Sequence, residues 1–313
     1  MNIRFLQNVK GDRQASARIR IITPSQGFQK LGFDGGYNKP VDSESIGIIH
    51  KCSTDSLRYK PTCKKIIWDV CDNYFYQPHN KAKAYHLLEN CDAVTTTTEK
   101  LKGILQQKCD EIGIKRKIFI VDDPVYYKFK EPVFAPKEQI NVTWYGNDGN
   151  LSYADWDKLF FQPLLESDLN IKLNFMNQRG TLPKGIEKLI GKHAVKHYPW
   201  SIENQEKLAS KSDFIILPID HTHEFTVGKS HNKLVDGLAC GTMVLASPQD
   251  SYLKFSDYAY IGNNFVENIT HCINNLEQTK LKIEKGQQYI NENLSSTAIA
   301  QRWIEIAKEL YHE

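Results

Sequence analysis

The chain has 313 residues, of which 41 % are hydrophobic and 25 % are charged, and its formal net charge is +3. These values are typical of a soluble globular protein and allow two domains of ordinary size. No apolar run approaches the roughly 18 residues that cross a bilayer, which excludes a membrane-spanning protein, and the weak positive charge permits an anionic substrate or a membrane surface without requiring one.

The first residues and the cysteines both favour a cytoplasmic protein. The start, MNIRFLQNVKGDR, has a short apolar core and no small-residue cleavage pattern, so it does not resemble a signal peptide. The chain has an odd number of cysteines and no pair at CxxC spacing, which favours reduced, mostly buried thiols over a disulfide framework or a zinc site. The cysteines are Cys52, Cys63, Cys71, Cys91, Cys109, Cys240 and Cys272.

The first half of the chain alternates between short strand-like runs rich in β-branched residues and helical segments. The predicted strands are 18–22, 46–50, 65–70, 93–98 and 117–121. The predicted helices are 80–91 and 98–113. Such alternation predicts a parallel sheet covered by helices. The basic cluster Lys115–Lys117 is interpreted as a solvated turn in preference to a nucleic-acid patch, and residues 128–139, with two prolines and several charges, as a linker.

A second alternating series follows the linker, so two parallel α/β domains in tandem are the simplest interpretation. The predicted strands are 140–146, 171–176, 214–219 and 243–247. The predicted helices are 153–167, 186–193, 201–212 with Ser201 as N-cap, 229–240, and most of 264–313, where Trp303, Ile306 and Leu310 share one face.

The segment GKSHNKLVDGLACG, residues 228–241, carries the clearest functional signal. On a helix over 229–240, one face holds Lys229, Asn232, Lys233, Asp236 and Cys240. The other face holds His231, Leu234, Val235 and Leu238 and can pack on a sheet. The polar face would begin beyond the carboxyl end of strand 214–219, where ligands bind in doubly wound sheets.

A nucleoside diphosphate suits the chemistry of this segment. Free N–H groups at a helix start favour an anion, Gly228 allows close approach of the backbone, Lys229 adds a positive charge and Ser230 a hydroxyl donor. Asp236, about two turns further on, can accept hydrogen bonds from ribose hydroxyls, and Asn232 lies between.

The same segment has two other interpretations. Ordinary helix capping with Lys233 and Asp236 as a solvated ion pair has about equal weight from spacing alone, and Gly241 would end the helix in a left-handed conformation. A phosphate-binding loop of the NTPase type is excluded because position 223 is His, not Gly.

The pattern strand, loop, GKSxNKLxDxLAxG, strand resembles the donor-site segment of nucleotide-sugar glycosyltransferases with two Rossmann-like domains. This is the GT-B fold, and the segment is most similar to the large retaining, family 4-like group of bacterial polysaccharide and lipopolysaccharide enzymes. Further segments resemble parts of this fold: VTWYGNDGN, HYPWSIENQEKLASKSDFIILP, SARIRI, IIWDVCDNYF and CDAVTTTTEKL. The resemblance implies two Rossmann-like domains facing each other across a cleft.

The resemblance also implies the roles of particular residues toward a UDP- or GDP-linked sugar. Lys229 and the adjoining amides would hold the diphosphate, Asp236 stands where the family usually has a ribose-binding Glu, and Arg179 could replace a phosphate-facing Arg. The implied donor-binding residues are Gly146, Asn147, Gly149, Asn150, Tyr198, Trp200, Glu224, Gly228, Ser230, Asn232, Lys233 and Asp236.

Catalysis is expected to need no metal and no cofactor, because a lysine with oriented amides can stabilise the departing diphosphate. The candidate catalytic residues are Lys229, Asp72 and Asp69. The two aspartates end strand 65–70 and would either orient the acceptor or assist its deprotonation; the alternative is a pair of helix caps or a structural hydrogen-bond anchor. Arg18 and Arg20 share one face of a predicted strand, which we expect to face solvent in preference to phosphate.

Two metal-like patterns are interpreted as structural. Asp155-Trp156-Asp157 lies inside a predicted helix and is interpreted as a first-turn charge pair. His221, His223 and His231 lack a completing ligand other than Glu224, so a zinc site is not favoured. Instead, His223 or Glu224 would touch the sugar.

The sequence therefore predicts a cytoplasmic, metal-independent, retaining glycosyltransferase that acts on a glycan or other hydroxyl acceptor. The predicted parts are an acceptor domain at 1–133, a donor-nucleotide domain at 138–295 and a C-terminal helix at 296–313 that packs back toward the first domain. Domain closure would exclude water, and peripheral membrane contact is permitted. The alternatives are sugar transfer to modified, phage-type DNA and a non-catalytic nucleotide-sugar-binding protein.

Overall fold

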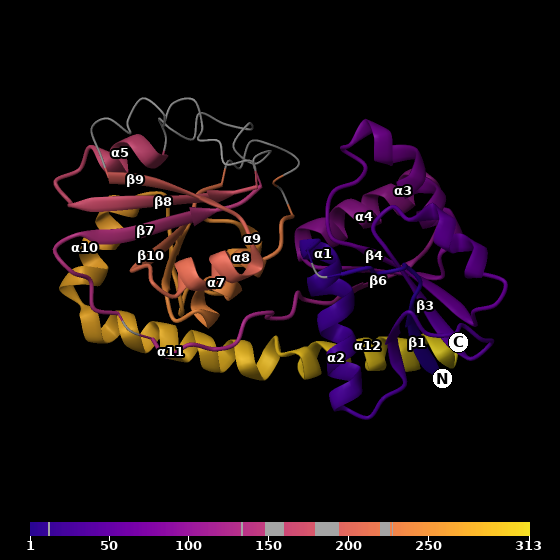
Figure 1. The fold of residues 1–313 in the computed structure, drawn as a ribbon. Coiled ribbons are helices and arrows are strands. Elements are labelled where there is room, and N and C mark those ends of the chain that lie inside the picture. Colours follow the sequence, from indigo (N-terminus) through magenta and orange to yellow (C-terminus); the bar gives the residue numbers. More distant parts are fainter. Residues whose placement is uncertain (12, 133, 148–159, 179–193, 220–225, 227) are drawn as a thin grey trace. The chain divides into compact units, whose positions relative to one another are not determined.

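A computed structural model describes residues 1–313 except 12, 133, 148–159, 179–193, 220–225 and 227 (Figure 1). The chain divides into two compact units. Unit 1 comprises Met1–Tyr126, Glu224–Asn232 and Asn291–Glu313, and unit 2 comprises Tyr127–His223 and Lys233–Ile290. The chain thus returns to unit 1 twice, first with a short segment that contains Lys229 and then with its C-terminal residues.

Unit 1 is built on a parallel sheet of six strands in the order β2-β1-β3-β4-β5-β6. The strands are β1 (Asn2–Phe5), β2 (Gly35–Tyr37), β3 (Ser45–His50), β4 (Lys65–Val70), β5 (Ala93–Thr96) and β6 (Lys117–Ile120). The helices are α1 (Ala15–Ala17), a π-helix (Arg18–Ile22), α2 (Thr23–Lys30), a 3-10 helix (Thr54–Tyr59), α3 (Pro78–Asn90), α4 (Glu99–Glu111) and α12 (Ser296–Tyr311).

Helices cover both faces of this sheet, whose strands β1, β3, β4 and β5 are buried at nearly every position. One face packs on α3 and α4 through a core that includes Trp68, Leu87 and Leu105, all inaccessible to solvent. On the other face, Phe5 contacts Trp303 of α12 edge-on with ring centroids 6.0 Å apart. Figure 1 shows α12 and α2 running along this second face.

Residues 18–22 form a π-helix, so the predicted strand there is wrong. The expectation that Arg18 and Arg20 face solvent is also wrong, because both side chains are buried. The physical reason is tertiary packing: Arg20 bonds the Asp69 and Asp123 carboxylates in the core, and these long-range contacts outweigh the β propensity of the isoleucines around it.

Unit 2 is built on a second parallel sheet, ordered β12-β11-β10-β7-β8-β9. The strands are β7 (Ile140–Tyr145), β8 (Ile171–Asn177), β9 (Ala194–Pro199), β10 (Phe214–Leu217), β11 (Met243–Ala246) and β12 (Tyr260–Ile261). The helices are α5 (Gln162–Leu165), α7 (Ile202–Ala209), α8 (Asn232–Ala239), α9 (Asp250–Leu253), α10 (Phe265–Asn274) and α11 (Leu276–Asn293). Starting from β9, this is the strand order of the dinucleotide-binding Rossmann fold.

Most elements predicted from the sequence are confirmed, including the N-cap at Ser201, whose hydroxyl accepts from the Asn204 N–H. Strands β1, β2, β9 and β12 were not predicted. The predicted helix 186–193 and residues 153–159 of the predicted helix 153–167 lie outside the described residues.

The helix predicted over 229–240 is shorter than expected and begins at Asn232. Gly228 lies in a turn with φ +88°, and the Lys229 N–H donates to the Thr226 carbonyl. Residues 229–231 precede the helix without helical structure. Asp236 and Cys240, expected on a polar face, are buried, which corrects the predicted solvated pair of Lys233 and Asp236. Gly241 has φ +77° and ends the helix as predicted.

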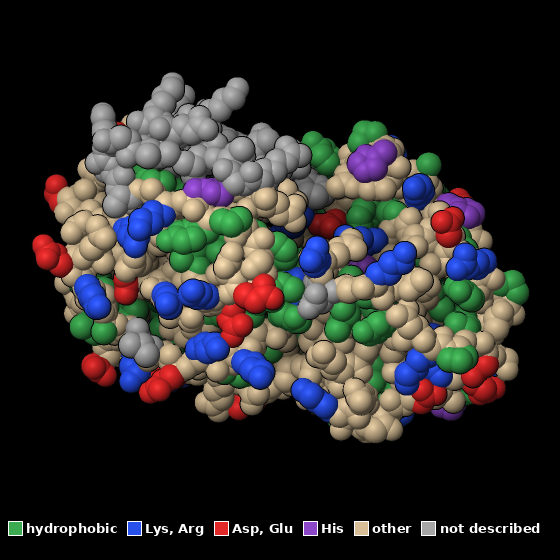
Figure 2. Space-filling view, in the orientation of Figure 1, with side chains coloured by type: hydrophobic (Ala, Val, Ile, Leu, Met, Phe, Trp, Pro, Cys, Tyr) green, Lys and Arg blue, Asp and Glu red, His purple; other side chains and the backbone are tan. Residues whose placement is uncertain are grey.

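The surface carries mixed charge. On the face drawn in Figure 2, basic and acidic side chains alternate, without a large field of one sign. All seven cysteines are free thiols, four of them buried, which agrees with the expected state. Among the helices of the described part of the chain, none has the length and hydropathy of a membrane span.

Candidate functional site

Each sheet has one point where the chain reverses its direction of strand addition, and the predicted site residues gather at these points. In unit 1 the reversal falls between β1 and β3, and in unit 2 it falls between β7 and β10. Ligands of open parallel sheets bind beyond the carboxyl ends of the strands at such positions. The strand order therefore predicts one position for a ligand in each unit.

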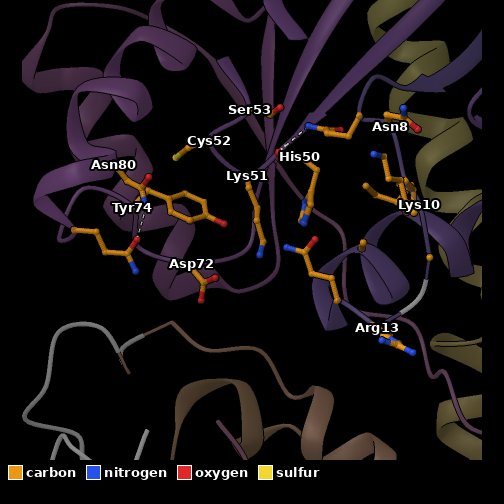
Figure 3. Close-up of a pocket in the computed structure, with 17 residues that line it drawn as sticks. Asn8, Lys10, Arg13, His50, Lys51, Cys52, Ser53, Asp72, Tyr74 and Asn80 are labelled. Atoms are coloured by element: carbon orange, nitrogen blue, oxygen red, sulfur yellow. Dashed lines mark hydrogen bonds between the residues drawn. The ribbon is translucent and has the colours of Figure 1, made fainter. Parts of the chain in front are cut away.

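A cavity of about 1040 Å³ occupies this place in unit 1 (Figure 3). Its lining comes from the segments that follow β1, β3 and β4 and from the start of α3. The lining residues that matter for the chemistry are Lys10, Arg13, His50, Lys51, Asp72 and Asn80. We call it the unit 1 cavity.

Asp69, a predicted catalytic residue, lies beneath this cavity with no exposed surface. Its carboxylate accepts hydrogen bonds from Arg20 Nη2 at 2.5 Å and Nε at 3.1 Å, from His50 Nδ1 at 2.8 Å and from Thr95 Oγ1 at 2.9 Å. Arg20 also pairs with Asp123 at 3.1 Å. Asp69 therefore has the contacts of a structural hydrogen-bond anchor, which was one of the roles that the sequence left open for it.

The pKa values of this cluster follow from burial and pairing. Burial pushes the pKa of Asp69 upward, but the charge of Arg20 and the hydrogen bond from His50 outweigh it, so the pKa lies well below the ordinary value of 3.8. Burial lowers the pKa of Arg20, and Asp69 and Asp123 more than reverse that effect. Both groups are therefore charged at neutral pH.

Lys229 and Asp72, the other two predicted catalytic residues, are brought together. Lys229 Nζ donates to Asp72 Oδ1 at 2.6 Å, and Asp72 also lines the unit 1 cavity. The neighbouring Ser230 hydroxyl donates to Asp123 Oδ2 at 2.5 Å, and Thr98 Oγ1 donates to the Gly228 carbonyl at 3.2 Å. The segment 228–230 is thus fixed to the carboxyl-terminal edge of the unit 1 sheet.

Several predicted donor-binding residues meet in unit 2. Trp200 Nε1 donates to Gln205 Oε1 at 2.7 Å, and Gln205 Nε2 lies 3.5 Å from Asp236 Oδ2. A Cβ added at Gly146 would lie 2.9 Å from Lys233 Nζ, which itself stands 5.8 Å from the centre of the Trp144 ring. Tyr145 is the last residue of β7, and its hydroxyl donates to the Lys233 carbonyl at 2.8 Å.

The remaining predicted donor residues are more scattered. Asn147 is exposed, and Tyr198 and Asn232 are half-buried. Gly149, Asn150 and Glu224 lie outside the described residues, as do Arg179, Asp155, Asp157, His221 and His223. His231 is buried, 3.6 Å from Asp122, and the described residues contain no group of three or more potential metal ligands.

Several residues of these sites were not predicted from the sequence, notably His50, Lys51, Asp123 and Gln205. His50 is the last residue of strand β3 and Lys51 directly follows it, and in a parallel sheet this position is a signal for the ligand-binding edge. Gln205 is a polar residue on the buried face of a short amphipathic helix, a pattern that requires a buried partner.

Comparison with solved structures agrees with this architecture. HepE from Anabaena in complex with UDP and glucose is 11 % identical, covers 99 % of this chain and 100 % of its own, and has a TM-score of 0.67. An alpha-glucosyltransferase in complex with UDP and a 13-mer DNA containing an HMU base is 12 % identical, covers 98 % of each chain and has a TM-score of 0.65. The chain has the GT-B fold.

TarM is similar over a smaller share of its length. It is 13 % identical with a TM-score of 0.62, and the match covers 93 % of this chain but only 58 % of TarM. No protein-family model matches the chain, and no curated protein matches it.

Asp69→Asn is expected to lower the free energy of unfolding by about 3 kcal/mol, because it leaves the buried Arg20 guanidinium short of a compensating charge. Since the folded pKa of Asp69 is depressed, its contribution is complete above the ordinary value of 3.8 and is lost as the pH falls toward the folded value. The difference between wild type and variant, measured by urea denaturation, should therefore shrink at acid pH.

Glu305→Gln provides the control for this experiment. Glu305 pairs with Arg302 at 3.5 Å on the surface of the same unit, so its loss should cost less than about 1 kcal/mol. Equal effects of the two substitutions would contradict the anchoring role of Asp69.

Proposed function

We propose that this protein is a glycosyltransferase that moves a sugar from a nucleoside-diphosphate sugar to a hydroxyl acceptor. The observation that carries the proposal is the position of Lys229. Its ammonium group is held at 2.6 Å from Asp72, three residues before helix α8, which contains Asp236 in its second turn. The fold and the nucleotide complexes of HepE and of the alpha-glucosyltransferase support it.

In this proposal Lys229 acts on the leaving group. The bond between the anomeric carbon and the diphosphate oxygen breaks, the acceptor oxygen bonds to that carbon, and the acceptor proton leaves with the diphosphate or to a nearby base. Negative charge grows on the departing oxygen, so a positive charge fixed beside it stabilises the transition state more than the ground state. We propose that this cation replaces a metal ion and that the transfer proceeds with retention.

Unit 2 supplies the groups that we assign to the nucleoside. Asp236 can accept from the ribose hydroxyls, and its carboxylate is positioned by Gln205, which in turn is held by the indole of Trp200. Trp200 and Tyr198 are both half-buried and offer faces on which a base can stack. Gly146 has no side chain, and any larger residue would meet the Trp144 ring and Lys233.

A second candidate activity is sugar transfer to modified DNA, and it differs from the main proposal in the class of acceptor. The alpha-glucosyltransferase that resembles this chain was solved with DNA, which favours testing transfer to modified DNA. Release of nucleoside diphosphate that depends on a glycan or polyol acceptor would support the main proposal, and release that depends on DNA would support the second. If the protein binds nucleotide sugars but releases no nucleoside diphosphate with any acceptor, it would be a non-catalytic binding protein.

We propose a cytoplasmic location for this enzyme. The seven free thiols are typical of a reducing compartment, and nucleotide sugars are the proposed co-substrates. Activity is expected to persist in excess EDTA, since the proposed mechanism draws its positive charge from Lys229.

Lys229→Ala is expected to lower kcat by about 10²–10³, the usual effect of removing one electrostatic donor to a developing anion. The measurement is nucleoside diphosphate release under saturating donor. The matched control is Lys211→Ala, which removes an exposed lysine at the end of α7. Unchanged kcat in Lys229→Ala would remove this residue from the mechanism.

Asp236→Asn is expected to act on donor binding and to raise the KM for the nucleotide sugar by about tenfold, because it removes a charged hydrogen-bond acceptor worth about 1.5–3 kcal/mol. Gln205→Ala should raise the same KM by a smaller factor, since Gln205 acts only through Asp236 and Trp200. The affinity for UDP and for GDP, measured by calorimetry, should fall in the same order. A kcat effect without a KM effect would argue against ribose binding.

A further inference from the structure

We propose that the unit 1 cavity is the acceptor subsite and that it takes a phosphorylated sugar or polyol, with the phosphate bound by Lys10, Arg13 and Lys51 and a hydroxyl bound by His50. This inference rests on the proposed function and on the acceptor domain that the sequence predicts at 1–133. The cavity lies at the reversal point of the unit 1 sheet, beside the Lys229–Asp72 pair.

The charge of the lining favours an anion. Lys10, Arg13 and Lys51 contribute three cations, and Asp72 is the sole carboxylate among the described residues that line the cavity. That carboxylate already bonds Lys229, so it cannot offset the other cations in full. Figure 3 shows Lys51 extending between Tyr74 and His50, with Lys10 and Arg13 on the His50 side. A phosphate entering here meets positive charge from more than one segment.

Lys51 has an unusual backbone that presents its side chain to the cavity. Its φ is +57°, the left-handed region that costs a residue other than glycine about 1 kcal/mol or more. The conformation is fixed from both sides, because the Lys51 N–H donates to the Asp69 carbonyl at 3.0 Å and the Trp68 indole donates to the Lys51 carbonyl at 2.7 Å. Strain held in this way clusters at ligand sites.

His50 offers a hydrogen-bond acceptor to the same cavity. Its Nδ1 bonds the Asp69 carboxylate at 2.8 Å, which can only accept, so Nδ1 carries a hydrogen. In the neutral form of the ring, Nε2 then keeps its lone pair. Nε2 is buried and has no hydrogen-bond partner among the described residues, although the ring lines the cavity. A buried acceptor without a partner requires one, and a ligand hydroxyl supplies it.

The rest of the lining suits a polyhydroxy compound better than a bare anion. The amide side chains of Gln7, Asn8, Gln77 and Asn80 and the hydroxyl of Ser53 surround the cations. Amides both donate and accept, which matches sugar hydroxyls. A volume of about 1040 Å³ also exceeds what one phosphate fills.

The test uses Cys52 and Cys63 as paired reporters in the intact protein. Both thiols are half-buried in unit 1, and burial raises the pKa of each to about 11. Cys52 lines the cavity and Cys63 does not. Alkylation at mildly alkaline pH is followed for each thiol by mass spectrometry, with glucose 6-phosphate, glycerol 3-phosphate, glucose, inorganic phosphate or a DNA oligonucleotide present.

Glucose 6-phosphate or glycerol 3-phosphate is expected to slow alkylation of Cys52 severalfold and to leave Cys63 unchanged, while glucose has no effect at the same concentration. In Lys51→Ala, about ten times more sugar phosphate should be needed to protect Cys52 to the same extent. The control is Lys115→Ala, which removes an exposed lysine of unit 1 outside the cavity and should leave the protection unchanged. His50→Ala should weaken binding of the sugar phosphate but not of inorganic phosphate.

Three results would overturn the inference. The first is equal protection by inorganic phosphate and the sugar phosphates, the second is protection by DNA alone, and the third is no loss of protection in Lys51→Ala. The proposed function is tested separately by nucleoside diphosphate release. If release occurs with neutral acceptors while Cys52 is never protected, the glycosyltransferase stands and the phosphorylated acceptor fails. If the sugar phosphates protect Cys52 but no donor is turned over, the phosphate subsite stands and the glycosyltransferase fails.

Discussion

The buried pair of Arg20 and Asp69 is the interaction on which the geometry of unit 1 depends. Asp69 is on β4, and its carboxylate is bonded by His50 of β3, Thr95 of β5 and Arg20 of the π-helix. Arg20 extends the network through Asp123 to Ser230. A charge placed in the core is stable only when every partner is present, so this network fixes three strands and the segment 228–230 together. The positions of the unit 1 cavity and of the segment 228–230 both depend on this network.

The return of residues 224–232 to unit 1 has a chemical consequence. Lys229 bonds Asp72 within unit 1, whereas helix α8, which begins three residues later, continues into unit 2. Our proposals for the diphosphate and the acceptor therefore share one anchored segment, and a change in either would be felt by Lys229.

The sequence alone was enough to predict the two parallel sheets, because short runs rich in apolar and β-branched residues alternate with helical segments along the chain. The sequence also pointed to Lys229, Asp72 and Asp236 as candidate site residues. It failed at residues 18–22, where β-branched residues suggested a strand and long-range contacts of Arg20 decided otherwise. His50 and Lys51 escaped notice because a histidine after a strand has no motif, and its meaning comes from Asp69, 19 residues away. Such pairings are set by tertiary folding, which local patterns do not encode.

The ion pair of Lys229 and Asp72 is suited to being broken. Their side chains are 32 % and 22 % exposed, so solvent screens the attraction and the pair contributes at most about 1 kcal/mol. A diphosphate carries more charge than one carboxylate and offers several oxygens, so it competes for the same ammonium group at little cost to folding. The buried Arg20–Asp69 pair cannot be exchanged in this way. Unit 1 thus contains one exposed ion pair that a ligand can replace and one buried pair that it cannot. In our proposal Lys229 of the exposed pair binds the diphosphate, and Arg20 of the buried pair maintains the structure around it.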